Sequence, residues 1–207
     1  MSILKLLFLT TIVSVSVYGQ DSIKTIDYQP IDNIIDSLSS FADSYPPTIE
    51  DSSQLEKAND LFRSLIKRMD LLSKDKPDNY ETESRFGEIY RMGHNLDMKD
   101  AWKYSEKHLK KAIKLRAGVP RPYFSLGLLY VNSDITLAPK AEELFIKAID
   151  LSPDRQFPFA YQALAFAYYY QGKFKKAIGA LDTFLLYYPD DEQGVNMKNI
   201  IIQKMKK

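Results

Sequence analysis

The apolar positions of this 207-residue chain recur at helical spacing over most of its length. Apolar side chains three or four residues apart lie on one face of an α-helix. This pattern predicts helices near residues 30–43, 53–73, 80–92, 101–117, 121–132, 139–151, 157–171, 174–187 and 190–207. No strand pattern competes with these helices. The sequence therefore predicts an all-α protein.

A single spacing of aromatic, apolar and small residues repeats along the chain. The last copy contains Tyr161, Leu164, Ala165, Tyr168, Gly172, Ala177, Leu181 and Pro189. The preceding copy contains Tyr123, Leu126, Gly127, Tyr130, Ala141, Phe145, Ala148 and Pro153. A weaker copy upstream contains Phe86, Gly87, Tyr90, Leu109 and Ala112. Repeats this short predict stacked structural units, because one unit alone cannot bury its apolar face.

The last copy, residues 158–191, resembles the tetratricopeptide repeat (TPR), a unit of about 34 residues with two helices joined by a turn. The match to that pattern covers the aromatic, Leu-Ala and Tyr positions of its first helix. It also covers the small and apolar residues of the second helix and the final proline. The resemblance implies a right-handed superhelical TPR-like solenoid of antiparallel helix pairs, with capping helices at both ends.

The repeat spacing divides the chain into consecutive units. The N-terminal helices are expected to form a degenerate first repeat or a cap, and the C-terminal helix a second cap. In chain order we expect N-terminal helices over 20–79, TPR-like units over 80–119, 120–157 and 158–191, and the C-terminal capping helix over 192–207. The first full unit departs from the pattern, since Glu83 stands at its aromatic position and Ser105 stands where Ala is expected.

The first nineteen residues differ from the rest of the chain. Lys5 is followed by an uncharged, mostly apolar run from Leu6 to Tyr18, and Gly19 suits a cleavage site. This arrangement is typical of a secretory signal peptide over residues 1–19. The alternative is a membrane anchor, which needs about 20 apolar residues, and this run is shorter. We therefore expect a periplasmic or secreted protein with no stable membrane span after signal cleavage.

The charges of the chain nearly cancel, with 28 Lys and Arg side chains against 27 Asp and Glu. Proteins that bind nucleic acid typically carry a basic excess, so we expect no nucleic-acid partner. The chain contains no Cys, which excludes disulfides. It also contains no Asn-x-Ser/Thr glycosylation site, which favours a bacterial source.

Basic residues gather on one side of the helix predicted over 101–117. They are Lys103, Lys107, Lys110, Lys111 and Lys114. This face is either a solvated surface or a docking site for the acidic N-terminal part of the chain or for an anionic envelope partner. Docking of an acidic segment or partner on this face would weaken at high salt.

The resemblance also implies a partner-binding groove, because in TPR proteins the first helices of successive units line a concave surface that binds peptides. Helical periodicity selects its side chains here. The candidate groove residues are Arg85, Glu88, Arg121, Phe124, Leu128, Asn132, Phe159, Gln162, Phe166, Tyr169 and Tyr170. Such a groove would be charged at one end and aromatic at the other. Two alternatives are that the aromatic side chains pack under the C-terminal helix or a neighbouring unit, or that they form a contact in a homo-oligomer.

Catalytic chemistry finds little support in the sequence. His94 and His108 stand outside any metal-ligand spacing, and no Gly-rich phosphate loop or nucleophile elbow occurs. We therefore expect no enzyme activity, cofactor or metal. The leading hypothesis is an exported scaffold that binds a protein or peptide partner through its groove. The alternative is a module that binds envelope polysaccharide or peptidoglycan with the aromatic end.

Overall fold

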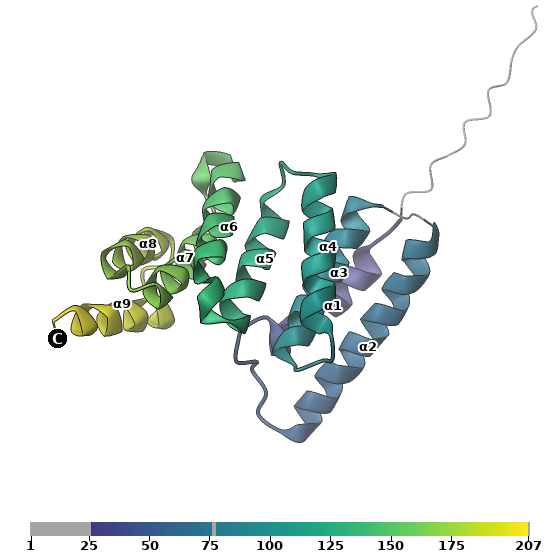
Figure 1. Ribbon diagram of the computed structural model, residues 1–207. Helices are drawn as coiled ribbons and strands as arrows, with labels where there is room; N and C mark the ends of the chain where they lie inside the picture. Colours follow the sequence, from purple (N-terminus) through teal and green to yellow (C-terminus); the bar gives the residue numbers. More distant parts are fainter. Residues whose placement is uncertain (1–25, 76–77, 207) are drawn as a thin grey trace, which may run out of the picture.

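The computed structural model describes residues 26–75 and 78–206, and within these ranges the chain is helical without strands (Figure 1). The predicted signal peptide, residues 1–19, lies outside the described residues. The helices are α1 (Gln29–Ala42), α2 (Ser52–Asp75), α3 (Tyr80–Asn95), α4 (Ala101–Leu115), α5 (Pro120–Ser133), η1 (Ile135–Leu137), α6 (Ala138–Leu151), η2 (Pro153–Arg155), α7 (Pro158–Tyr170), α8 (Phe174–Tyr187) and α9 (Glu192–Met205).

The helices pack as successive pairs that stack along one direction (Figure 1). The tightest pairs are α3 with α4, α5 with α6, and α7 with α8. The first helices also contact one another in sequence, α1 with α3, α3 with α5, and α5 with α7, while α9 packs on α8. The predicted all-α solenoid of helix pairs is therefore confirmed. Among the described helices, none is long and apolar enough to cross a membrane.

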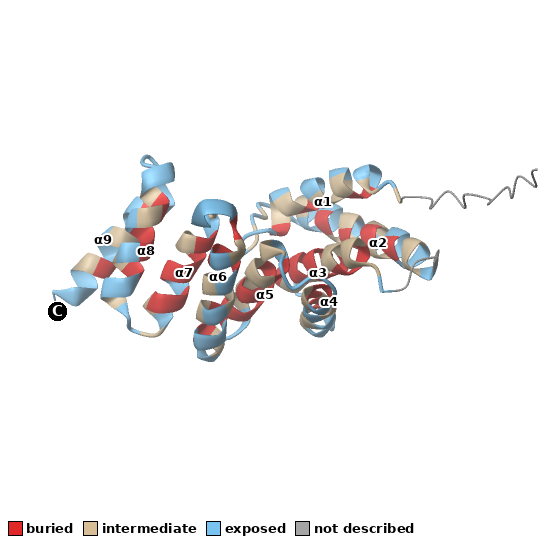
Figure 2. Cartoon of the chain, turned by 90° about the horizontal axis from the view of Figure 1, so that it is seen from above, coloured by how far each residue is buried: buried red, intermediate tan, exposed pale blue. Residues whose placement is uncertain are grey.

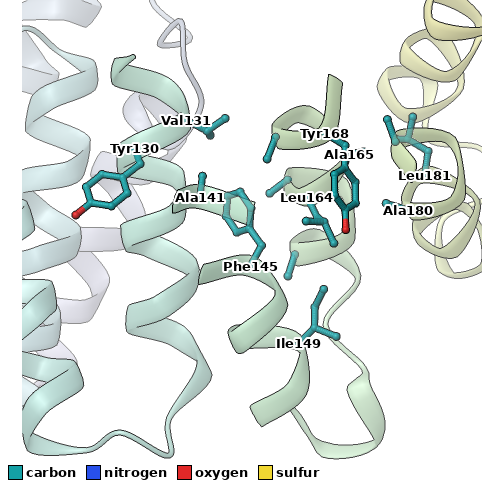
Figure 3. Close-up of a cluster of buried hydrophobic side chains, with 14 of the residues drawn as sticks. Tyr130, Val131, Ala141, Phe145, Ile149, Leu164, Ala165, Tyr168, Ala180 and Leu181 are labelled. Carbon is teal, nitrogen blue, oxygen red and sulfur yellow. The ribbon is translucent and has the colours of Figure 1, made fainter. Parts of the chain in front are cut away.

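Among the described residues, two hydrophobic clusters form the core, and buried segments face neighbouring helices (Figure 2). The first cluster joins α1, α2 and α3 around side chains such as Leu38, Leu65 and Ile89. The second runs from α4 to α9, with Phe145, Leu181 and other buried side chains between the helices (Figure 3). The repeated apolar positions of the sequence thus supply the contacts within and between pairs.

Glycines at the repeated small positions allow paired helices to approach closely. A Cβ atom on Gly127 would lie 2.5 Å from Cε1 of Phe145, and one on Gly87 would lie 2.4 Å from Cδ2 of Leu109. Gly93 fulfils the same role against the ring of Phe62, at 2.3 Å. The predicted end of α3 near residue 92 is wrong, because the helix continues to Asn95 with Gly93 inside it.

Several helix ends carry side-chain caps. Asn79 accepts a hydrogen bond from the Thr82 amide at the start of α3, and Asp191 accepts one from Gly194 at the start of α9. At the start of α2, the Asp51 carboxylate accepts a hydrogen bond from the Gln54 amide. Short polar side chains compete for such positions, and local backbone geometry decides between them.

The two departures from the repeat pattern in the α3–α4 pair have a structural explanation. Glu83 is buried, with one carboxylate oxygen 2.6 Å from Nδ1 of His108 and the other 2.7 Å from Nζ of Lys111. Ser105 is buried as well, and its hydroxyl donates a 2.8 Å hydrogen bond to the Gly87 carbonyl. Polar contacts between α3 and α4 therefore replace the aromatic and small apolar contacts of the other units.

Candidate partner-binding cavity

A cavity of about 620 Å³ opens between α3, α5, α7 and the loop that joins α1 to α2. Its volume lies within the range of about 300–1,000 Å³ that is usual for ligand sites. Polar and charged residues line it near α3, and aromatic and aliphatic residues line it near α7. The lining consists of Asp43, Ser44, Tyr45, Glu88, Arg91, Arg121, Phe124, Ser125, Leu128, Val131, Asn132, Ser133, Asp134, Ile135, Phe157, Phe159, Gln162, Ala163, Phe166, Tyr170 and Gln193.

An ion-pair network centred on the buried side chains of Glu88 and Arg91 forms the charged end of the cavity. The Glu88 carboxylate accepts hydrogen bonds from Nε of Arg121 at 2.8 Å, from Nε of Arg91 at 3.2 Å, and from the Ser125 hydroxyl. Arg91 continues the network by donating to the Asp43 carbonyl at 3.0 Å and to the Asp43 carboxylate. The network therefore connects α3 and α5 to the loop that follows α1.

The electrostatics of this network are dominated by Glu88. Burial of its carboxylate raises the pKa, but the charges of Arg121 and Arg91 and the hydrogen bonds from Arg121 and Ser125 outweigh burial and lower the pKa to about 2. The same carboxylate raises the pKa of Arg121. Two acids and two bases pair within the network, so its charges balance internally.

Helix α1 and its loop are fixed onto α3 by side chains of α3. Nδ2 of Asn95 donates to the Ala42 carbonyl at 2.9 Å and to the Ser44 carbonyl at 3.1 Å, which satisfies the last carbonyl of α1 and one carbonyl of the following loop. Arg85 makes a bidentate pair with the Asp32 carboxylate of α1, with both N–O distances 2.7 Å. Asp32 and Asp43 of the acidic N-terminal part thus pair with arginines of α3. The sequence had suggested the lysines of α4 as a docking site for this part of the chain.

The aromatic end of the cavity is formed mainly by α7. Phe159, Phe166 and Tyr170 lie on one face of this helix and are 50%, 39% and 44% exposed. Phe124 of α5 and Phe157 extend the surface, with ring centroids 4.7 Å apart. The three rings of α7 are therefore only partly covered, although Phe159 also packs against Phe184 and Tyr188, with ring centroids 6.1 and 5.2 Å away. Gln193 of α9 lines the cavity as well.

Helix α9 packs on another part of α7 and α8. Its buried Ile201 joins the core, and Nζ of Lys204 lies 4.8 Å from the ring centroid of Tyr169. Tyr169 is thus half-buried beside α9 and lies outside the cavity. Of the predicted groove residues, the structure brings together Glu88, Arg121, Phe124, Leu128, Asn132, Phe159, Gln162, Phe166 and Tyr170.

Two predicted groove residues lie elsewhere. Tyr169 faces α9 because it stands one position away from Tyr170 and so lies off the face of α7 that the cavity uses. Arg85 stands one turn before Glu88 on the same side of α3, but at that level α1 covers α3 and Arg85 pairs with Asp32. Sequence reasoning missed the wall formed by Asp43, Ser44 and Tyr45. No periodic signal marks that loop, since its position depends on bonds from residues of α3 that are about fifty positions away. That the cavity binds a partner stays a prediction.

The basic face of α4 is partly neutralised within the chain. Lys111 pairs with Asp78 at 2.6 Å and with Glu83 at 2.7 Å, and Lys110 pairs with Glu106 at 2.7 Å. Across residues 26–75 and 78–206, no group of three or more His, Asp or Glu side chains is arranged to hold a metal ion.

Comparison with known proteins identifies the fold. No family model matches the sequence, and no curated protein matches it. A crystal structure of MamA has a TM-score of 0.60 at 19% identity, over 76% of this chain and 86% of that one. TTC0263, a thermophilic TPR protein of Thermus thermophilus, has a TM-score of 0.54 at 16% identity, over 84% of this chain and 99% of that one. The chain therefore has the fold of the tetratricopeptide repeat proteins, as its repeat spacing implied.

Proposed function

We propose that this chain is an exported, non-enzymatic scaffold that binds a protein or peptide partner in the cavity between α5, α7 and the α1–α2 loop. The fold is that of protein-interaction scaffolds in general. The observation that carries the proposal is the exposure of Phe159, Phe166 and Tyr170 on the concave wall of a hollow of about 620 Å³. Exposed apolar side chains gathered in one hollow are typical of interaction sites.

The energetics favour a partner with apolar side chains. Burying one aromatic or large aliphatic side chain contributes roughly 1.5–3 kcal/mol. The three exposed rings of α7 remain 39–50% exposed, so a partner that covers them gains a part of this energy from each ring. Clusters of a few aromatic anchors commonly supply most of the affinity of an interface.

Export of the chain rests on the sequence of residues 1–19. An apolar run behind Lys5, with Gly19 at a suitable cleavage position, supports it. Intact-mass measurement of the protein recovered from the native host tests this part: a mature N-terminus at residue 20 supports export, and an intact Met1 contradicts it.

Affinity capture tests the binding site. The protein is used as bait in three forms: native, Phe166→Asp, and Leu186→Asp. Leu186 is 82% exposed on α8 outside the cavity, so Leu186→Asp adds the same charge to an exposed apolar position without touching the site. A protein retained by the native and Leu186→Asp baits but lost by Phe166→Asp, and then shown to bind directly as a purified protein, supports the proposal.

Two other outcomes have clear meanings. Equal capture by all three baits contradicts binding in the cavity. Binding of purified envelope polysaccharide or peptidoglycan that is lost in Phe166→Asp, without any protein partner, would replace the scaffold function by polymer binding at the aromatic end.

A further inference from the structure

The cavity has two facing stripes of side chains at helical spacing. On α5 the stripe is Arg121, Phe124, Leu128 and Asn132, and on α7 it is Phe159, Gln162, Phe166 and Tyr170. Both helices begin at a proline and contact each other, and each is antiparallel to α6, so the stripes run in parallel. Tyr170 stands eleven positions after Phe159. At the rise of an α-helix the stripe is therefore about 16 Å long, or three turns.

The walls of this groove offer few hydrogen bonds to a peptide backbone. The helices that form it satisfy their own amides and carbonyls. Between the ends of the two stripes the polar side chain is Gln162, alongside Phe124, Leu128 and Phe166, while Asn132 is the second-last residue of α5. The neighbouring Ser125 hydroxyl already pairs with Glu88. An extended peptide needs partners along its whole backbone, whereas an α-helix satisfies its backbone internally and can present one apolar face. The chemistry of the walls therefore favours a helix as the occupant.

The charges around the groove restrict that helix further. At the α3 side, Glu88, Arg91, Arg121 and Asp43 already pair with one another. A charged partner side chain pushed against this network would lose its water without gaining an unpaired opposite charge, which is unfavourable. The face of the helix that enters the groove must then be uncharged.

The ends of the groove differ in sign. The electropositive N-termini of α5 and α7 lie at one end, where Arg121 is already paired with Glu88. Asp134 and the C-termini of α5 and α7 lie at the other. Since helix N-termini are electropositive and C-termini electronegative, an occupying helix fits best with its N-terminus beside Asp134.

From these observations we infer that the cavity binds one amphipathic α-helix of the partner, about three turns long, with an uncharged apolar face and a direction antiparallel to α5 and α7. This inference rests on the proposed function, which it makes more specific. Phe166 and Tyr170 are the anchors of the interaction, and Asn132 and Gln162 contribute little to it.

A displayed library of random 16-residue peptides tests the inference with the purified protein as bait. Peptides retained by the native protein and lost by Phe166→Asp are sequenced. The inference expects apolar residues at i, i+3 or i+4, and i+7, no charge among them, and a gain of helical circular dichroism on binding. Enriched peptides with no helical spacing, or with acidic anchors, overturn the inference but leave the scaffold function standing. The absence of any peptide that depends on Phe166 contradicts both.

Matched variants distinguish a helix from an extended peptide. For a selected peptide, Phe166→Ala is expected to weaken binding about tenfold or more, because it removes an apolar anchor. Gln162→Ala, one turn away on the same helix, is expected to change the Kd by less than about threefold. A larger loss from Gln162→Ala than from Phe166→Ala would mean that side-chain amides hold an extended backbone, and would overturn the inference.

The direction of the helix is measured separately. A nitroxide label on the N-terminus of the peptide is expected to broaden the amide resonances near Tyr170 and Asp134, and a label on its C-terminus those near Arg121. The reverse pattern would contradict the antiparallel orientation.

Discussion

Glu88→Gln is the substitution that most directly tests how the charged end of the cavity is built. Glutamine keeps the size of the side chain and one carbonyl oxygen, but it removes the charge that Arg91 and Arg121 face. Arg91 is only 2% exposed, so its guanidinium would keep just the Asp43 carboxylate as an ionic partner. We expect the substitution to destabilise the protein strongly while leaving the helices in place.

The magnitude follows from proton linkage. The pKa of Glu88 falls from 4.5 to about 2 in the folded chain. Each pKa unit corresponds to about 1.36 kcal/mol, so ionised Glu88 contributes about 3 kcal/mol to the free energy of unfolding at neutral pH. Loss of one partner from a buried ion pair costs about 3–5 kcal/mol in other proteins, which is of the same size.

The pH dependence has a definite sign. Because the folded-state pKa of Glu88 is depressed, its stabilisation is fully present above pH 4.5 and is lost as the pH falls toward about 2. The difference in unfolding free energy between native protein and Glu88→Gln is therefore expected to shrink from about 3 kcal/mol at neutral pH to about 1 kcal/mol near pH 3. Urea denaturation followed by far-UV circular dichroism at several pH values measures this difference.

Glu143→Gln provides the matched control, because Glu143 is exposed on α6. It is expected to change the free energy of unfolding by less than about 0.5 kcal/mol at every pH. A Glu88→Gln difference that stays below about 1 kcal/mol at neutral pH, or one that does not depend on pH, would refute the buried-network reasoning.

Two further predictions concern the α3–α4 and α5–α6 pairs. Gly127→Ala places a Cβ 2.5 Å from Cε1 of Phe145 and is expected to destabilise the protein by about 1–3 kcal/mol. Gly179→Ala is the control on the surface of α8, because no atom lies within 4 Å of the added Cβ there. This control should stabilise the protein by about 0.5–1 kcal/mol. Thermal or urea unfolding measures both, and equal effects would contradict the close-approach argument. Ser105→Ala restores the residue that is expected at this repeat position but removes the 2.8 Å hydrogen bond to the Gly87 carbonyl. The free energy of unfolding is expected to fall by about 1 kcal/mol. A gain in stability would show that this hydrogen bond makes no net contribution.

The fold was predictable because its determinants are local and periodic. Small residues such as Gly127 and Ala165 and their large partners recur at fixed intervals, and each pair of helices packs mainly on its neighbours. Such contacts can be inferred from spacing alone. Helix ends were less predictable, as Gly93 shows: α3 continues past it to Asn95, and its close packing against Phe62 is a contact that no local signal reveals.

The candidate site was predictable only in part, for the same physical reason. Phe159, Phe166 and Tyr170 follow from the periodicity of one helix, and the structure brings them to one surface. The loop at Asp43 depends on hydrogen bonds to Arg91 and Asn95, residues about fifty positions away, so its place in the cavity wall cannot be inferred from spacing.

The two ends of the cavity are expected to have separate roles. At the charged end, Glu88 and Arg91 pair within the chain and hold the α1–α2 loop in position, so substitutions there should lower stability and affect binding only through the loop. At the aromatic end, Phe166 is 39% exposed and makes up part of an open surface, so substitutions there should lower affinity with little change in stability. On this reasoning Glu88→Gln should mainly lower the free energy of unfolding. Phe166→Ala should mainly weaken the binding free energy.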